Sequence, residues 1–185
     1  MTDHHTVHHC IPSPLGPITL CANDQGLLGV WLARQTSQPG DLGRPAGDHP
    51  IIVLAGTELA DYFAGHFTRQ RRTFSVPLAA VGTPFQMQVW QALRAIPYGQ
   101  TWSYQDLAES IDRPTAARAV GMANGKNPLS IVVPCHRVIG KSGRLTGYAG
   151  GVERKAWLLE HEALTHNEHE TLARNEHETI TRNET

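Results

Sequence analysis

The feature that most constrains the fold is a pair of short amphipathic segments separated by Asp112-Arg113-Pro114. Before this break, Ser103 and Asp106 form an S-x-x-D helix start that is followed by apolar residues at helical spacing. After the break, roughly Pro114 to Ala123 predicts a second helix, which an Asn-Gly-Lys-Asn-Pro stretch ends. Two short helices across a tight break predict a helix-turn-helix.

A longer helix is predicted just upstream of this pair. Thr83 can act as its cap, Pro84 suits the first helical position, and Gln86 lies three residues after the cap. From Phe85 onward, apolar residues recur at i, i+4, i+7, i+8 and i+11, until Pro97 and a nearby glycine end the element.

The first eighty residues predict a small α+β unit. Two apolar runs within residues 18–33 are joined by Asn23-Asp24-Gln25-Gly26, which predicts a β-hairpin. The stretch Ser37 to His49 is rich in Gly, Pro and Asp and predicts a loop, whereas Ile51 to Gly65 predicts a helix. Phe, Val and Leu alternate along residues 74–78, as they do in a strand.

Composition limits the class of protein. A chain of 185 residues suits one domain or two small ones, and 40% hydrophobic with 18% charged residues is enough apolar material for a core. We expect neither a membrane protein nor a secreted one, because an 18-residue apolar run and a signal-peptide pattern are both lacking. Three irregularly spaced cysteines argue against a disulfide framework and predict a reducing cytoplasm.

Charge divides the chain into three parts. Residues 1–82 carry a net charge of −1, residues 83–165 of +3, and residues 166–185 of −3. We therefore predict an N-terminal α+β domain over 1–82, a second, mildly basic domain over 83–165, and an acidic tail over 166–185. The middle part is basic enough to permit contact with nucleic acid without requiring it.

Both ends of the chain are predicted to be solvated. The tail repeats HNEHETLA as RNEHETIT and then RNET, which predicts disorder, with a marginal helix or a histidine metal site as alternatives. The His4-His5 and His8-His9-Cys10 cluster is interpreted as a frayed end, the alternative being a structural metal site.

The helix predicted from Pro114 to Ala123 can contact DNA but cannot recognise a particular base sequence. Ala117, Ala119 and Gly121 are too small to make bidentate contacts with base edges, although they let a backbone approach a groove closely. Arg118 is one long cation among them, able to enter the base stack or bind a phosphate. The alternative is a buried, Ala-rich helix with Arg118 on a solvent face.

Residues 129–133 form an apolar, strand-like run that leads into Pro134-Cys135-His136, which we expect in a turn or pocket wall. A Cys-His pair is weak evidence for catalysis alone, because neighbouring residues of a strand point in opposite directions. Cys135 and His136 would then interact only through an irregular backbone or a bridging water.

The segments around this pair carry a specific resemblance. The run IVVPCHRVIG, preceded by RAVGMANGKNP and followed by TGYAGGVERKAWLLEHE, closely resembles the O6-alkylguanine-DNA alkyltransferases, and its wording is most similar to bacterial constitutive members. The resemblance is dense from Thr83 to Glu162 and reaches SPLG and DYFAG in the first part. It implies an α+β fold of two lobes, an RNase H-like N-terminal lobe and a winged-helix or helix-turn-helix C-terminal lobe that holds the active site.

The resemblance also implies a mechanism, in which Cys135 accepts the alkyl group. A thiol must become a thiolate to attack an alkyl carbon, so a base is required. In the family His136 supplies this base through a water molecule, Glu162 holds the imidazole, and Asn127 fixes the backbone nearby. No cofactor and no metal are implied, because alignment on SPLG places Asn23 and Leu28 where zinc ligands of some members fall.

The implied partner is double-stranded DNA containing O6-alkylguanine. We expect the protein that binds it to be monomeric and cytoplasmic. The target base lies inside the duplex and has to be flipped out. Arg118 would fill the vacated stack, and Tyr104 would donate to guanine N3. The remaining implied residues line the substrate pocket or order its loop: Val138, Tyr148, Ala149, Gly150 and Lys155.

Two rival functions follow from the same residues. Alkyltransferase-like proteins keep the DNA-binding lobe but replace the cysteine, whereas Cys135 is present here. A cysteine hydrolase could use Cys135, His136 and Glu162 on a small substrate, but the helix-turn-helix would then lack an explanation.

Overall fold

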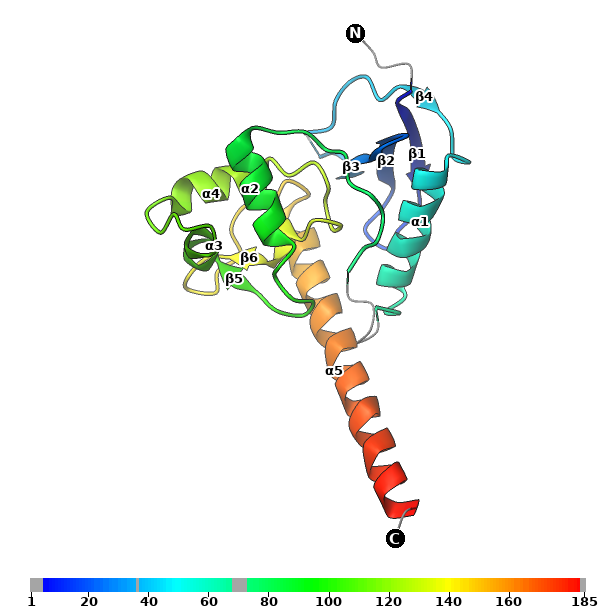
Figure 1. The fold of residues 1–185 in the computed structure, drawn as a ribbon, viewed down its shortest axis with the longest axis vertical. Coiled ribbons are helices and arrows are strands. Elements are labelled where there is room, and N and C mark those ends of the chain that lie inside the picture. Colours follow the sequence, from blue (N-terminus) through cyan, green and yellow to red (C-terminus); the bar gives the residue numbers. More distant parts are fainter. Residues whose placement is uncertain (1–4, 36, 68–72, 184–185) are drawn as a thin grey trace.

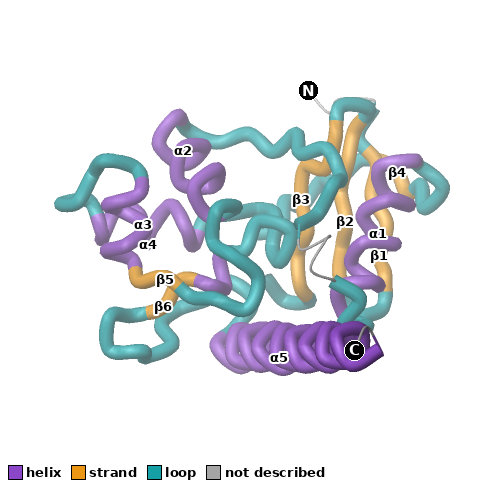
Figure 2. Tube along the Cα trace, turned by 60° about the horizontal axis from the view of Figure 1, so that its bottom comes forward, coloured by secondary structure: helices purple, strands orange, loops and turns teal. Residues whose placement is uncertain are grey.

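A computed structural model describes residues 5–35, 37–67 and 73–183, with backbone alone at 169–170 and 172–183. The chain forms two lobes that lie side by side, an α/β lobe and a mostly helical lobe, and α5 runs along both of them (Figures 1 and 2). This confirms the predicted α+β class. None of the described helices is long and apolar enough to cross a membrane.

The N-terminal lobe is a four-stranded sheet in the order β3-β2-β1-β4, covered by α1. Its strands are β1 (Val7–Ile11), β2 (Ile18–Asn23), β3 (Gly26–Leu32) and β4 (Arg44–Pro45), and α1 spans Pro50–Phe63. The predicted hairpin is confirmed, since β2 and β3 pair antiparallel. The side chain of Asn23 makes its turn by accepting hydrogen bonds from the backbone of Gln25 and Gly26.

The strand predicted over residues 74–78 is wrong. The buried carboxylate of Glu58 accepts the backbone N–H groups of Ser75 and Val76 at 3.0 and 3.1 Å. Pro77 has no N–H to give. Only Leu78 makes a bridge, to Leu27 of β3, because the groups that a ladder would need are already used.

The C-terminal lobe contains the predicted helix-turn-helix. It is built from α2 (Pro84–Leu93), α3 (Tyr104–Ser110) and α4 (Ala117–Gly125), which pack on one another. Both capping boxes form, Thr83 with Gln86 and Ser103 with Asp106, so the two predicted helix starts are confirmed. The helix expected from Pro114 begins three residues later, because a turn from Arg113 to Ala116 takes up the intervening backbone.

A second small sheet brings distant parts of this lobe together. The strand β5 (Trp102–Ser103) pairs in parallel with β6 (Val138–Ile139), and β6 directly follows the short 3₁₀ helix η1 (Cys135–Arg137). As a consequence, the start of α3 lies beside the cysteine segment.

For the tail, the structure shows the alternative named above, a helix, since α5 continues unbroken over Val152–Asn183. Its first turns are anchored by residues that lie on one face and are fully buried, Lys155, Leu158 and Glu162. Extending an existing helix adds one hydrogen bond per fixed residue, and the repeat contains neither Gly nor Pro to stop it. The tail therefore leaves the body as a helix, drawn orange to red in Figure 1.

Candidate active site

Cys135 begins a tight turn, as expected, but the run before it is not a strand. The run 129–133 contributes one bridge, Leu129 to Val30 of β3, and then folds back through Ile131, whose φ is 73°. Val133 N donates to Leu129 O at 2.9 Å, and Cys135 N donates to Val133 O at 2.8 Å. The strand expectation fails here because successive residues bond locally, and the turn removes the objection that Cys135 and His136 must face opposite ways.

Asn127 holds this turn and the thiol together. Its Nδ2 donates to Val133 O at 2.9 Å and to Cys135 Sγ at 3.1 Å, and its Oδ1 accepts from Leu129 N at 3.0 Å. Cys135 is 4% exposed. Burial raises the pKa of the Cys135 thiol, although Asn127 and the charge of Lys155 act against this shift. At neutral pH the thiol therefore keeps its proton until a base takes it.

His136 and Glu162 form a buried pair. His136 Nε2 lies 2.7 Å from Glu162 Oε1, and both side chains are fully buried. Burial alone would raise the pKa of Glu162, but His136 and Arg137 hold it well below its usual range. An ionised carboxylate only accepts, so Nε2 carries the hydrogen and Nδ1 keeps a lone pair.

That Nδ1 atom is the base the site offers. It is buried and has no hydrogen-bond partner among the described residues. Burial lowers the pKa of His136, as do the charges of Arg137 and Lys155, whereas Glu162 raises it. His136 is therefore neutral at neutral pH and able to accept a proton at Nδ1.

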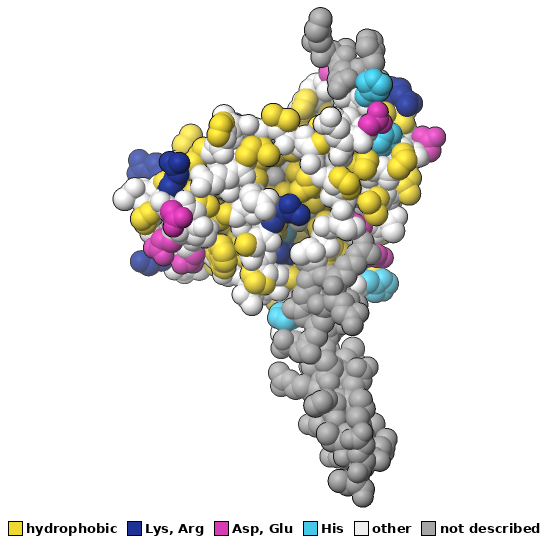
Figure 3. Space-filling model, in the orientation of Figure 1, with side chains coloured by type: hydrophobic (Ala, Val, Ile, Leu, Met, Phe, Trp, Pro, Cys, Tyr) yellow, Lys and Arg dark blue, Asp and Glu magenta, His cyan; other side chains and the backbone are white. Residues whose placement is uncertain are grey.

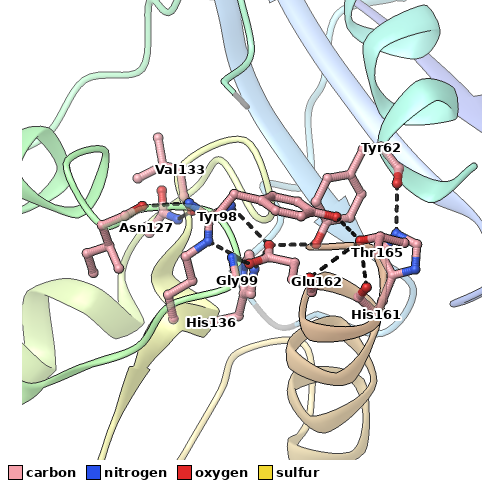
Figure 4. A network of polar contacts seen from close by, with 11 residues as sticks. Tyr62, Tyr98, Gly99, Asn127, Val133, His136, His161, Glu162 and Thr165 are labelled. Carbon is pink, nitrogen blue, oxygen red and sulfur yellow. Dashed lines mark hydrogen bonds and ion pairs between the residues drawn. The ribbon is translucent and has the colours of Figure 1, made fainter. Parts of the chain in front are cut away.

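Arg137 is a site residue that sequence reasoning missed. Its Nε and Nη2 donate to the two oxygens of Glu162 at 2.8 and 3.0 Å, and its Nη1 donates to Ile96 O at 2.7 Å. Tyr62 and the backbone of Gly99 also donate to Glu162 (Figure 4). The signal for Arg137 was a charge inside an otherwise apolar run, whereas Tyr62 lies 100 residues from its partner.

The expected pocket residues meet next to β6. Lys155 Nζ donates to Val138 O and, at 3.1 Å, to Thr146 O, so it ties the loop that follows β6. Thr146 Oγ1 donates to the hydroxyl of Tyr104 at 3.2 Å. Burial raises the pKa of Tyr148 well above its ordinary value, and the charge of Cys135 adds to this shift.

The end of this loop is fastened to the N-terminal lobe. Arg154 Nη1 donates to Ala33 O at 2.7 Å and to Gly150 O at 3.1 Å. Gly150 is required by space, because a Cβ there would lie 2.5 Å from Leu32 and 2.7 Å from the Tyr148 ring. Ala149 is half-buried beside it.

The helix α4 presents a small-residue surface. Arg118 and Ala119 are exposed, whereas Ala117 and Gly121 are half-buried. Lys and Arg side chains are visible at the end of the molecule where α3 and α4 lie (Figure 3). Asn124, on the buried side of α4, donates to Cys135 O at 3.4 Å and was not predicted.

The comparisons with known proteins agree with this geometry. Residues 6–80 match the family model "6-O-methylguanine DNA methyltransferase, ribonuclease-like domain", and residues 84–164 match its "DNA binding domain". The chain belongs to the 6-O-methylguanine DNA methyltransferase family. The predicted resemblance and the ribonuclease-like and DNA-binding lobes are thereby confirmed.

Individual relatives are similar to this chain over most of its length. It is 46% identical over 162 residues to the methylated-DNA–protein-cysteine methyltransferase of Mycobacterium leprae, covering 85% of this chain and 95% of the relative. The protein of that name from Salmonella typhimurium is 64% identical over 168 residues, covering 82% and 92%. A solved structure, "Mycobacterium tuberculosis OGT in complex with DNA", is 47% identical, covers 86% of this chain and 94% of its own, and has a TM-score of 0.77.

The prediction concerning metals stays a prediction. Among the described residues, no group of three His, Cys, Asp or Glu side chains is placed to hold a metal ion. His4 lies outside the described residues, as do the side chains of His169 and His177.

Proposed function

We propose that Cys135 is the alkyl acceptor of this family member and that His136, Glu162 and Asn127 activate and hold it. The observation that carries the proposal is the free Nδ1 of a buried imidazole whose other nitrogen is fixed on Glu162, next to a buried thiol. The reaction is direct reversal of O6-alkylation in guanine.

The proposed step balances as follows. His136 Nδ1 takes the proton of Cys135 through a water molecule, the thiolate attacks the alkyl carbon, a new S–C bond forms, and the O6–C bond breaks. The electron pair of that bond goes to guanine O6, Tyr104 gives its hydroxyl proton to N3 so that the base leaves neutral, and the proton that His136 took from Cys135 restores the Tyr104 hydroxyl through solvent. A thioether has no good leaving group, so each molecule reacts once.

The positions of these residues support a proposal for how the substrate binds. We propose double-stranded DNA containing O6-alkylguanine, with α4 against the duplex, Arg118 in the gap left by the flipped base, and Ala117, Ala119 and Gly121 allowing close approach. The pocket would be lined by the turn at Val138, by Tyr148 and by Ala149-Gly150, with Lys155 holding that loop.

The remaining proposals concern organisation. We propose a boundary at residue 82, a monomer, and action without cofactor or metal. We also propose a cytoplasmic location, on the ground that Cys10, Cys21 and Cys135 are free thiols.

The test is a mass measurement after incubation with a duplex that carries one O6-methylguanine. We expect one methyl group per protein, mapped to Cys135 and absent in Cys135→Ser. Cys21→Ser is the matched control, because Cys21 is also buried and burial raises its pKa to about 11, so that its removal leaves transfer intact. Methylation elsewhere, repeated turnover, or ester hydrolysis in place of transfer would contradict the proposal.

A further inference from the structure

The N-terminal lobe supplies a hydrogen bond to the buried carboxylate of the C-terminal lobe. Tyr62, near the end of α1, donates from its hydroxyl to Glu162 Oε1 at 2.9 Å, and it is fully buried. Oε1 is the same oxygen that holds His136 Nε2 at 2.7 Å. The Tyr62 hydroxyl and the His136 imidazole therefore bind the same carboxylate oxygen (Figure 4).

The ring of Tyr62 leaves this hydroxyl little freedom. It packs edge-on against Phe67 and Tyr98, with ring centroids 5.4 and 6.0 Å away, and tilted against His161 at 5.4 Å. His161 also bonds the backbone oxygen of Tyr62 through Nε2 at 2.8 Å. The position of the donor is thus set by both lobes and by α5.

We propose that Tyr62 is a positioning residue for alkyl transfer, whose hydroxyl orients Glu162 and offsets part of its charge at Oε1. The proposal rests on the functions proposed above for Cys135, His136 and Glu162. It makes the N-terminal lobe part of the active site, although the cysteine, histidine and glutamate all come from the other lobe or from α5.

The consequence for the base has a definite sign. Oε1 accepts from His136, Arg137 and Tyr62, while Oε2 accepts from Arg137 and Gly99. Without the Tyr62 hydroxyl, more of the negative charge on Oε1 acts on the imidazole, so the charged form of His136 becomes more stable. The other titratable or charged groups facing the pair stay in place: Arg137, Lys155, His161, Tyr98 and Cys135.

The test is the pH profile of transfer from free O6-benzylguanine, which needs no base flipping, measured from about pH 5 to about pH 9. The rate falls on the acid side as His136 becomes protonated. In Tyr62→Phe we expect this acid limb of the pH profile to lie at higher pH than in wild type, by on the order of half a pH unit. Tyr98→Phe is the matched control: it also removes a buried tyrosine hydroxyl, one bonded to Thr165 instead of Glu162, and we expect its limb to stay with wild type.

The outcomes separate the two proposals. A wild-type protein whose Cys135 is not alkylated overturns the proposed function. Suppose instead that wild type is alkylated at Cys135. The assignment of Tyr62 alone is then overturned if the acid limb of Tyr62→Phe coincides with that of wild type, or is shifted no more than that of Tyr98→Phe. If Tyr62→Phe does not fold, 3-fluorotyrosine at position 62 keeps the ring and makes the hydroxyl a stronger donor. The limb should then move to lower pH, and an unmoved limb overturns the assignment.

Discussion

Asn127 and Cys135 are joined by a hydrogen bond of 3.1 Å from the amide nitrogen Nδ2 to Sγ, across eight positions of the chain. The same amide nitrogen holds the backbone oxygen of Val133 at 2.9 Å. One side chain therefore sets both the shape of the turn and the place of the thiol within it.

Asn127→Ala should lower both stability and thiol reactivity. It leaves the buried Leu129 nitrogen unsatisfied, which costs about 1–3 kcal/mol, and it removes one of the two donors to the Val133 oxygen. Urea unfolding measures the first effect and the rate of Cys135 alkylation the second. Unchanged alkylation in a folded variant would show that the Sγ contact has no function.

Stability should fall on the acid side of neutrality. The pKa of His136 is lowered in the folded state, so the unfolded chain binds its proton first, and folding loses free energy as pH drops below the unfolded value of about 6.5. The pKa of Glu162 is also lowered, so its contribution, complete above about 4.3, is lost as pH falls further. The test is the free energy of unfolding of wild type and of His136→Gln, measured from about pH 7.5 downward. We expect wild type to show both losses and His136→Gln to show only the second, because the first comes from His136.

Arg137 should be among the most sensitive positions for stability. Arg137→Leu removes the cation paired with the buried Glu162 carboxylate and the donor to the Ile96 oxygen. Breaking a buried ion pair of this kind costs about 3–5 kcal/mol. Arg137→Lys should recover only part of this, because an ammonium cannot bind both carboxylate oxygens through a planar fork.

The matched control for this prediction is Arg94→Ala. Arg94 is exposed and makes a 3.5 Å contact to Gln91, so its removal should change stability by less than about 0.5 kcal/mol. Equal thermal shifts for the two positions would contradict the importance of the Arg137–Glu162 pair.

If Arg118 fills the gap left by the flipped base, as proposed above, Arg118→Ala should slow transfer from duplex DNA more than it weakens binding. Reaction with free O6-alkylguanine needs no flipping and should stay within a few-fold of wild type. Binding of wild type should vary little with duplex sequence and should weaken with salt. Equal losses on duplex and free base would place Arg118 in the pocket or the fold.

Removal of the tail should leave transfer intact if the cut falls after Asn167. The ring of His166 lies against Gly99, where a Cβ would come within 2.7 Å of it, and Thr165 bonds the Tyr98 hydroxyl at 2.7 Å. Deleting residues 168–185 keeps both contacts, whereas deleting from Thr165 loses them and should lower the melting temperature. A large loss of transfer in the shorter deletion would reveal a function in the tail.

Local patterns predicted the elements whose causes are local. The capping boxes at Thr83 and Ser103 and the turn at Asn23 involve residues within three positions of one another, and all three form as expected. The strand predicted over 74–78 failed because Glu58, distant in sequence, takes its N–H groups. For the tail, the polar repeat favoured disorder over a helix, because composition does not register that an anchored helix gains a hydrogen bond with each residue added.

The sequence by itself determined the family and the helix-turn-helix and singled out Cys135, because each of these lies in a contiguous motif. Only the tertiary structure decided how the base is held. Glu162 gathers donors from α1, from the turn at Gly99 and from η1, and Tyr62 lies 100 positions away from it. Hydrogen bonds act over about 3 Å in space whatever the separation along the chain, so a buried network of this kind exists only once both lobes and α5 have packed together.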